Sequence, residues 1–285
     1  MIDHELQSEL RRQYNPDGSP LRDAQLRMLE LLKFLDRFCR EHNLRYWLPY
    51  GTLLGAARHG GFIPWDDDID VFMPREDALR LKELMADKVF DGHILLQTPD
   101  NDPAYTHSSW FSLRDLNSEY IQDSWAHRRL KYRGMQVDIF MTEDGVGERA
   151  ARVSRLMQIA GILWPSENVH STAFLRPMLR PIHNLLDRCI FPLMRRCSRN
   201  TSAHLRMGLG GMFLLDLDPA DVYPLRPIMF EGHEFYGPAD PDAVLRKQYG
   251  EWGSIPAESG RRTHLAQFRF FDAPAAAAPS AGKSH

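Results

Sequence analysis

Four aspartates lie within five residues of this chain: Asp66, Asp67, Asp68 and Asp70. No other segment constrains the fold as strongly, because at neutral pH these carboxylates repel one another unless a positive group sits among them. Trp65 and the apolar residues that follow the acids indicate that the cluster lies against a core. The alternative, a solvated turn at the entrance of a strand, is disfavoured by these apolar neighbours.

The spacing of the acids points to a metal. On a strand, residues two apart project to the same side, so Asp68 and Asp70 converge while Ile69 and Val71 enter the core. Two carboxylates on a rigid strand suit Mg²⁺ or Mn²⁺, which complete their coordination with water and substrate phosphate. A calcium loop of the EF-hand type is rejected, because Val71 replaces the required glycine and Asp77 the final glutamate.

A third acid, Asp138, interrupts the apolar run MQVDIFM at 135–141. A buried, ionised carboxylate is costly unless it meets a cation or a hydrogen-bond donor. We therefore expect Asp138 to join Asp68 and Asp70, as a metal ligand or as a general base. The alternative is an acid with no part in the chemistry.

The segment before the acids has the features of a phosphate-binding turn. Residues 45–50 are predicted to form a short strand that ends at Gly51, and Thr52 is expected to cap the following helix. Free backbone N–H groups and a hydroxyl would then point at a phosphate. Beyond the helix, Arg58 and His59 could neutralise phosphate oxygens, although a single arginine is more often a surface residue. The predicted substrate-binding residues are Gly51, Thr52, Arg58, His59 and Trp65.

Strand and helix patterns alternate along the chain, which indicates an α+β fold with a mixed sheet flanked by helices. Helical periodicity covers 21–44 and 75–89, and strands are predicted over 93–97 and 135–141. The expected parts are an N-terminal extension (1–20), a catalytic core (21–147), a helical insert (148–207), the C-terminal part of the same catalytic domain (208–272) and a disordered tail (273–285).

Arginines are spread among leucines, prolines and methionines in the expected insert. We favour a helical cap packed on the core. The alternative is an interfacial surface over 150–205 that makes a peripheral contact with anionic lipid or with a lipid-linked acceptor.

Composition excludes several classes of protein. The net charge of −3 provides no positive field for general nucleic-acid binding. Three cysteines without a CxxC spacing favour a reducing compartment. No uncharged apolar run approaches the roughly 20 residues that span a bilayer. We expect a cytoplasmic enzyme, located at the inner face of the membrane if the insert contacts lipid.

The run GTLLGAARHGGFIPWDDDID at 51–70 closely resembles the hallmark of the LicD/fukutin family, GTLLGxxRHxGFIPWDDDID. The resemblance continues through VDIF at 137–140, FEGHEFYGPA at 230–239 and KQYGEW at 247–252. One departure lies near Ser112, where a lysine would be expected to contact the donor phosphate.

The resemblance implies a nucleotidyltransferase-like core. It also implies transfer of phosphocholine or another phospho-alcohol from a CDP-linked donor, such as CDP-choline, to a glycan hydroxyl in cell-surface polysaccharide or lipopolysaccharide synthesis. At the matching positions, Asp68 and Asp70 would hold the metal, and Gly51 and Thr52 would form the phosphate turn. The acceptor would be a glycan or a lipid-linked glycan.

Two other functions stay open at this point. One is a nucleotidyltransferase that deposits a nucleotide on a small molecule or protein, and the other is a non-catalytic glycan- or metal-binding module. If the transferred alcohol is choline, its quaternary ammonium needs an aromatic box. The aromatic residues considered for that box are Trp110, Tyr120, Trp125 and Trp252.

Overall fold

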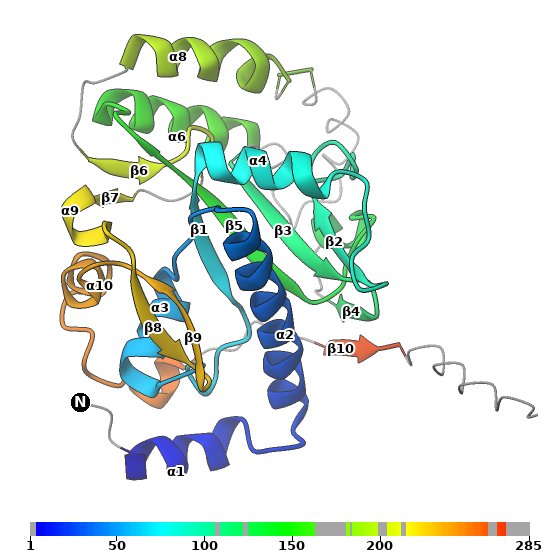
Figure 1. Cartoon of the computed structure of the whole chain (residues 1–285), viewed down its shortest axis with the longest axis vertical. Coiled ribbons are helices and arrows are strands. Elements are labelled where there is room, and N and C mark those ends of the chain that lie inside the picture. Colours follow the sequence, from blue (N-terminus) through cyan, green and yellow to red (C-terminus); the bar gives the residue numbers. More distant parts are fainter. Residues whose placement is uncertain are drawn as a thin grey trace, which may run out of the picture.

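The structure is a computed structural model of the chain (Figure 1). It describes residues 4–105, 109–121, 125–162, 181–182, 184–198, 204–211, 215–261 and 267–271. The α-helices are α1 (His4–Tyr14), α2 (Pro20–Glu41), α3 (Tyr50–His59), α4 (Arg75–Met85), α5 (Trp125–Arg128), α6 (Glu148–Ile162), α8 (Phe191–Ser198), α9 (Pro219–Val222) and α10 (Pro241–Tyr249). A π-helix, η2 (Leu186–Ile190), precedes α8, and a 3₁₀ turn, η3 (Glu258–Gly260), follows α10.

The strands form one mixed sheet and two small antiparallel pairs. They are β1 (Asp70–Pro74), β2 (Ile94–Gln97), β3 (Trp110–Asp115), β4 (Ser118–Ile121), β5 (Gln136–Asp144), β6 (Leu205–Met207), β7 (Asp216–Leu217), β8 (Arg226–Phe230), β9 (His233–Gly237) and β10 (Gln267–Phe270). The central sheet runs β2-β3-β5-β6-β7, and β1 pairs with β5 in parallel. The remaining pairs are β4 with β10 and β8 with β9. The α+β class predicted from the sequence is confirmed.

Helix α2 supplies much of the core beneath the sheet. Ser19 caps its first turn by accepting a hydrogen bond from the Arg22 backbone N–H, and Pro20 is the first helical residue. Fully buried side chains recur along one face at Ala24, Met28 and Leu35, the spacing of an amphipathic helix. Helices α2 and α4 both pack against the sheet (Figure 1).

The segment that leads to the acids differs from the sequence prediction. Only Trp47 of 45–50 makes a strand-like bridge, to Phe72, and the following helix begins at Tyr50. The N-cap of α3 is Pro49, so the prediction that Thr52 caps this helix is wrong. The Thr52 hydroxyl instead accepts a hydrogen bond of 2.9 Å from the Asp70 backbone N–H. Thr52 therefore fastens α3 to the start of β1.

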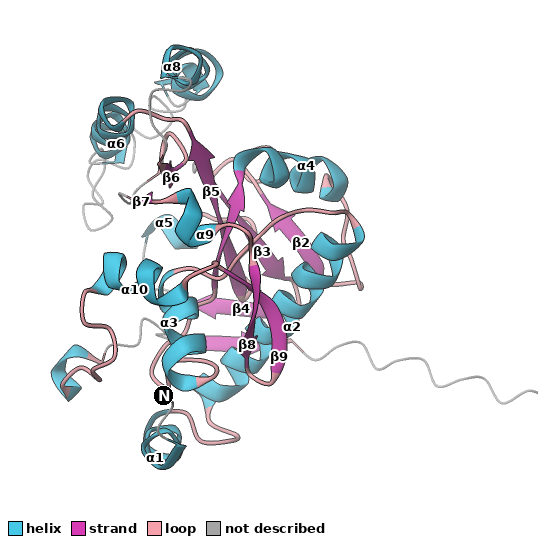
Figure 2. Ribbon diagram, turned by 60° about the vertical axis from the view of Figure 1, so that its left-hand side comes forward, coloured by secondary structure: helices cyan, strands magenta, loops and turns pink. Residues whose placement is uncertain are grey.

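The segment expected to be a helical insert is helical in α6, η2 and α8. These helices lie together at one end of the molecule, far from α1 (Figures 1 and 2). Strand β6 lies inside the expected 148–207 range and pairs with β5, so the helical part of the range ends before Leu205. Within the described residues, no helix is both long enough and apolar enough to cross a bilayer.

The second glycine of α3, Gly55, allows a close approach between that helix and the following loop. A Cβ atom at Gly55 would lie 2.4 Å from the Gly61 carbonyl oxygen and 3.3 Å from the Ile63 nitrogen. Since both neighbours are backbone atoms, neither can move away by changing a rotamer. The tight path of the chain into the acid cluster therefore depends on a glycine at this position.

We expect Gly55→Ala to lower the free energy of unfolding by roughly 1–3 kcal/mol, although alanine alone favours a helix over glycine by about 1 kcal/mol. Denaturant unfolding would measure the change. The matched control is Gly253→Ala, because a Cβ at Gly253 meets no atom within 4 Å. Equal unfolding midpoints for the two variants would contradict the steric argument.

Candidate active site

The parallel pairing of β1 with β5 brings two of the predicted acids together. Asp70 and Asp138 are register partners at the beginnings of these strands. Burial, and then the charges of Asp68, Asp138 and Asp66, raise the pKa of Asp70 well above its ordinary value. The prediction that Asp68 and Asp70 lie on the same strand is wrong, because β1 begins at Asp70 and Asp68 lies in the loop before it. The charges of the other two predicted carboxylates, Asp68 and Asp138, therefore both act on Asp70.

The other two acids of the cluster have different surroundings. Burial, and then the charges of Asp68 and Asp67, raise the pKa of Asp66 well above its ordinary value. Asp67 is buried, and its carboxylate accepts a hydrogen bond of 3.4 Å from the Tyr120 hydroxyl. Asp66 thus belongs with the mutually repelling carboxylates, whereas Asp67 has its own donor.

Asp138 is held by donors from two strands. Ser112 Oγ donates to Oδ1 over 2.5 Å, and Gln136 Nε2 donates to Oδ2 over 2.7 Å. The Tyr105 hydroxyl is 3.0 Å from Ser112 Oγ. Burial raises the pKa of Asp138, whereas the charge of Arg114 and the two hydrogen bonds oppose that rise.

The family resemblance led us to expect a lysine near Ser112. The positive charge is supplied instead by Arg114, two residues further along the same strand. Its side chain is buried, and it donates to Gln97 Oε1 over 2.7 Å and to the Gly134 carbonyl over 2.9 Å. Arg114 therefore offsets the charge of Asp138 from inside the protein. The sequence signal for this role is a single arginine in the strand WFSLRD.

A pocket of about 460 Å³ opens beside the acids, a volume typical of small-molecule sites. Its walls come from the start of α3, the acid loop and the segment after α10, and α3 contacts α10 (Figure 1). Of the predicted site residues, the pocket is lined by Gly51, Arg58, Trp65, Asp68 and Asp70. Thr52, His59 and Asp138 are not among its lining residues.

Two predicted phosphate contacts do not fit the structure. Thr52 is buried and bonded to the Asp70 backbone, so its hydroxyl is not directed at a ligand. His59 is buried, and burial together with the charge of Arg58 lowers its pKa to about 3. Since Arg58 Nε donates to His59 Nε2 over 2.9 Å, the proton of the neutral ring lies on Nδ1, which faces Gln7 Oε1. His59 therefore brings no positive charge to a phosphate.

Arg58 has a structural task that its position in the sequence does not reveal. Its Nη1 donates to the carbonyls of Trp252 and Ser254, over 3.1 and 2.9 Å. These bonds connect α3 to the side of the pocket formed by residues 249–256, called here the C-terminal wall. Arg58 lines the pocket as well, so one guanidinium both fastens the wall and contributes positive charge.

The C-terminal wall contains residues that the sequence analysis did not predict to belong to the site. Tyr249 and Glu251 line the pocket together with Trp252. The available signal was the run Tyr-Gly-Glu-Trp at 249–252, inside the segment KQYGEW that the sequence analysis had already noted. Among the aromatic residues considered for a choline box whose side chains the structure describes, Trp110, Tyr120 and Trp252, only Trp252 lines the pocket.

The other three candidates for the box have different environments. The rings of Trp110 and Phe140 meet edge to face at 5.2 Å, and the ring of Tyr120 packs on His127. The side chain of Trp125 lies outside the described residues.

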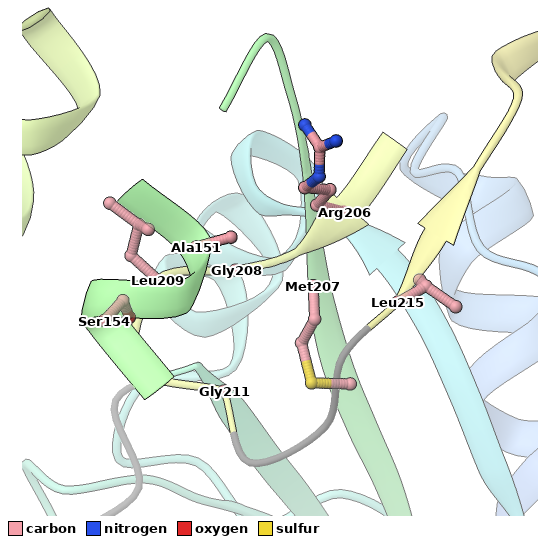
Figure 3. A pocket seen from close by; sticks show the side chains of 8 residues that line it. All are labelled: Ala151, Ser154, Arg206, Met207, Gly208, Leu209, Gly211 and Leu215. Atoms are coloured by element: carbon pink, nitrogen blue, oxygen red, sulfur yellow. The ribbon is translucent and has the colours of Figure 1, made fainter. Parts of the chain in front are cut away.

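A second cavity, between α6 and β6, is far too small for a substrate (Figure 3). Its volume of about 10 Å³ is about that of one water-sized probe. Ser154 Oγ accepts a hydrogen bond of 2.5 Å from the Gly210 backbone, and Arg206 donates to the Val146 carbonyl. This cavity is a packing feature that joins α6 to the edge of the sheet.

Comparison with known proteins identifies the domain that contains the acids. Residues 43–171 match the model of the LicD/FKTN/FKRP nucleotidyltransferase domain. These residues form a nucleotidyltransferase domain of the LicD family. All eight residues of the predicted site lie in this LicD-family range, whereas the C-terminal wall of the pocket lies beyond it.

Two curated relatives have named activities. The lipopolysaccharide cholinephosphotransferase LicD of Haemophilus influenzae is 40% identical over 138 residues, which are 48% of this chain and 49% of that protein. Ribitol 5-phosphate transferase FKRP of Homo sapiens is 54% identical over 41 residues, 14% of this chain and 8% of that protein. The chain thus matches about half the length of the first relative and a small part of the second.

The repulsion among the acids predicts an unusual pH dependence of stability. A carboxyl with a higher pKa in the folded than in the unfolded protein binds more protons when folded, so stability falls as the pH rises above its ordinary pKa of 3.8. In EDTA at pH 8, we expect Asp70→Asn to raise the melting temperature by about 2 °C or more, or roughly 1 kcal/mol. The gain should shrink towards pH 4.

Thermal unfolding across this pH range would measure the effect. Glu83→Gln is the control, because Glu83 is exposed on α4 and the substitution removes the same charge. A lower melting temperature for Asp70→Asn at pH 8 would show that the folded protein gains more from this charge than it loses.

Proposed function

We propose that this protein transfers a phospho-alcohol from a CDP-linked donor to a glycan hydroxyl, in the synthesis of a cell-surface polysaccharide or lipopolysaccharide. The observation that carries the proposal is the placement of Asp70 beside Asp138, next to a pocket lined by Asp66, Asp68 and Asp70. The names of the two relatives support transfer of this class of group.

A divalent cation fits the residues at this site. Among the described residues no three His, Cys, Asp or Glu side chains already have the geometry of a metal site. The donor set is nevertheless the oxygen-only set that Mg²⁺ and Mn²⁺ prefer, and a cation would relieve the repulsion that raises the pKa of Asp70. Asp68 and Asp70 would hold it. When bound, such an ion neutralises charge on the donor diphosphate and the leaving CMP.

The chain's own residues position the reactants. Gly51 lies in the first turn of α3 and lines the pocket, so its backbone N–H is available to a donor phosphate. Arg58, also in the pocket wall, adds a positive charge. Phosphoryl transfer depends mainly on such positioning and electrostatic stabilisation.

Asp138 is assigned the proton transfer. Its two oxygens accept hydrogen bonds from Ser112 and Gln136, which fix the carboxylate beside Asp70, and burial raises its pKa in the direction that favours a general base. The acceptor hydroxyl oxygen bonds to the phosphorus next to the alcohol, and the bond from that phosphorus to CMP breaks. The hydroxyl proton passes to Asp138, and CMP leaves with the bridging oxygen.

The pocket favours a positively charged alcohol such as choline. Its lining contains four carboxylates, those of Asp66, Asp68, Asp70 and Glu251, and one guanidinium, that of Arg58, which gives a net formal charge of −3. The two positive charges of one divalent cation cancel the two negative charges of a donor diphosphate. The net formal charge of −3 on the pocket lining therefore remains. A cationic alcohol reduces it, and a neutral polyol does not.

The aromatic rings support the same choice. The pocket lining includes Tyr50, Trp65, Tyr249 and Trp252, and aromatic faces attract quaternary ammonium groups. The Arg261 guanidinium already lies 5.2 Å from the ring centroid of Trp65. Trp252 is held in place by a hydrogen bond of 3.0 Å from its Nε1 to Asp242.

A second candidate function is nucleotidyl transfer, in which the acceptor attacks the phosphorus that carries the nucleoside. The match to a nucleotidyltransferase domain favours it, and the product would then carry the nucleotide itself. Mass spectrometry of products formed with a panel of CDP-alcohols, Mg²⁺ or Mn²⁺, and glycan acceptors separates the two reactions. Release of CMP supports the proposal, whereas a nucleotide added to the acceptor supports the second candidate.

The carboxylates should be essential to the transfer. We expect Asp68→Asn and Asp70→Asn each to lower kcat/KM by about 10³-fold or more, on the order of 4 kcal/mol. Binding of Mn²⁺ should weaken in the same variants, which electron paramagnetic resonance can follow without turnover. Glu83→Gln serves again as the control, and transfer at the wild-type rate in either variant would refute the mechanism.

Trp252 should discriminate between alcohols. Loss of one cation–π contact is worth about 0.5–2 kcal/mol, so we expect Trp252→Leu to raise KM for CDP-choline by roughly 2- to 30-fold while leaving a neutral CDP-alcohol little changed. Trp252→Phe, which keeps an aromatic face, should lie between Trp252→Leu and the wild type. Equal losses with both donors would contradict the selection of a cationic alcohol.

A further inference from the structure

The two helical segments at the end of the molecule have an inner and an outer apolar face. Their inner faces pack on a small buried core, to which Leu186 and Phe191 belong, together with Val146 and Leu209 from neighbouring loops. On α6, Ala150, Ala151 and Met157 pack against this core. Helices α6 and α8 lie side by side there, beyond the end of β5 (Figures 1 and 2). The inner faces therefore account for the folding of these segments.

The outer faces carry large aliphatic side chains in solvent. On α6 these are Val153 and Leu156, which are 47% and 65% exposed. On the segment that contains η2 and α8 they are Ile182, Leu185 and Leu193, which are 49%, 54% and 61% exposed. A helix that is apolar on both sides indicates that its outer face is covered in use.

The charges around these side chains are positive. Residues 148–157 and 184–198 contain six arginines and two acids, a net charge of +4, although the whole chain carries −3. One of the acids, Glu148, is paired with Arg152. The arginines Arg149, Arg152, Arg188 and Arg196 are exposed. An apolar face bordered by arginines fits the surface of an anionic bilayer.

A pocket of about 420 Å³ lies on the same segment, between the end of β5 and α8. Arg195 and Arg196 line it together with Glu143. Glu143 accepts two hydrogen bonds from Arg195, of 2.7 and 2.8 Å, and thereby neutralises it. Arg196 has no such partner among the described ion pairs and is available to a phosphate.

We propose that the outer faces of α6 and of residues 181–182 and 184–198 bind the surface of an anionic bilayer, with their aliphatic side chains at the level of the headgroups and Arg196 at a lipid phosphate. A second copy of the chain is a poorer occupant, because two faces with a charge of +4 repel each other. Along β5, Asp138 lies six residues before the end of the strand at Asp144, a distance of about 20 Å. An acceptor anchored in the bilayer must therefore extend over a comparable distance.

Co-sedimentation of the full chain with vesicles tests this proposal without any turnover, so it is independent of the proposed reaction. We expect binding to vesicles of phosphatidylglycerol and phosphatidylcholine, and at least about 10-fold weaker binding to pure phosphatidylcholine. Binding should also weaken as salt is added. The double variant Leu156→Glu, Leu193→Glu should lose about 10-fold or more, and Arg196→Glu should reduce binding to the anionic vesicles alone.

Val89→Glu is the matched control, because Val89 is 49% exposed in the loop between α4 and β2. Melting temperatures within a few degrees of the wild type would confirm that the variants are folded. Two results would overturn the proposal: vesicle binding that is absent or unaffected by the double variant, and a stable dimer that the double variant dissociates. Equal losses in Val89→Glu would overturn it as well, since binding would then not be local to these helices.

Discussion

The repulsion among carboxylates at the start of β1 and β5 is the constraint on which the rest of the site depends. Parallel pairing sets Asp70 beside Asp138, and burial removes the water that would otherwise screen them. The fold must therefore hold these strands together against a local electrostatic cost. The stripe of α2 that packs beneath the sheet, and the hydrogen bond from the Asp70 backbone to Thr52, supply part of that restraint.

The positive charges near the acids are placed behind or beside them. Arg114 acts on Asp138 from the interior, while Ser112 and Gln136 bond to the carboxylate directly. Arg58 lines the pocket, but it donates two hydrogen bonds to backbone carbonyls of the C-terminal segment. This arrangement leaves the pocket with a negative excess, which suits a site that takes up cations together with a phosphorylated donor.

The sequence predicted the parts of this site that depend on short-range patterns. The α+β class and the long helix α2 follow from periodicities within about 20 residues. The pairing of Asp70 with Asp138 comes instead from two strands that meet in the sheet. The roles of Thr52 and His59 could not be predicted in this way, because they depend on burial against other elements. The bond from Arg58 to Trp252 joins residues 194 positions apart, and no local pattern encodes such a contact. The same distance explains why Tyr249 and Glu251 were missed.

The separation between the acids and the C-terminal wall also limits what the relatives can say about the alcohol. Asp68 and Trp252 are 184 positions apart, whereas the match to the cholinephosphotransferase extends over 138 residues and the match to the ribitol 5-phosphate transferase over 41. Neither stretch is long enough to contain both features. The acids carry the proposed transfer, a reaction that both relatives' names describe, while the proposed choice of alcohol depends on a wall that lies outside the matched domain. The argument for a cationic alcohol therefore rests on the charge and the aromatic rings of the pocket itself.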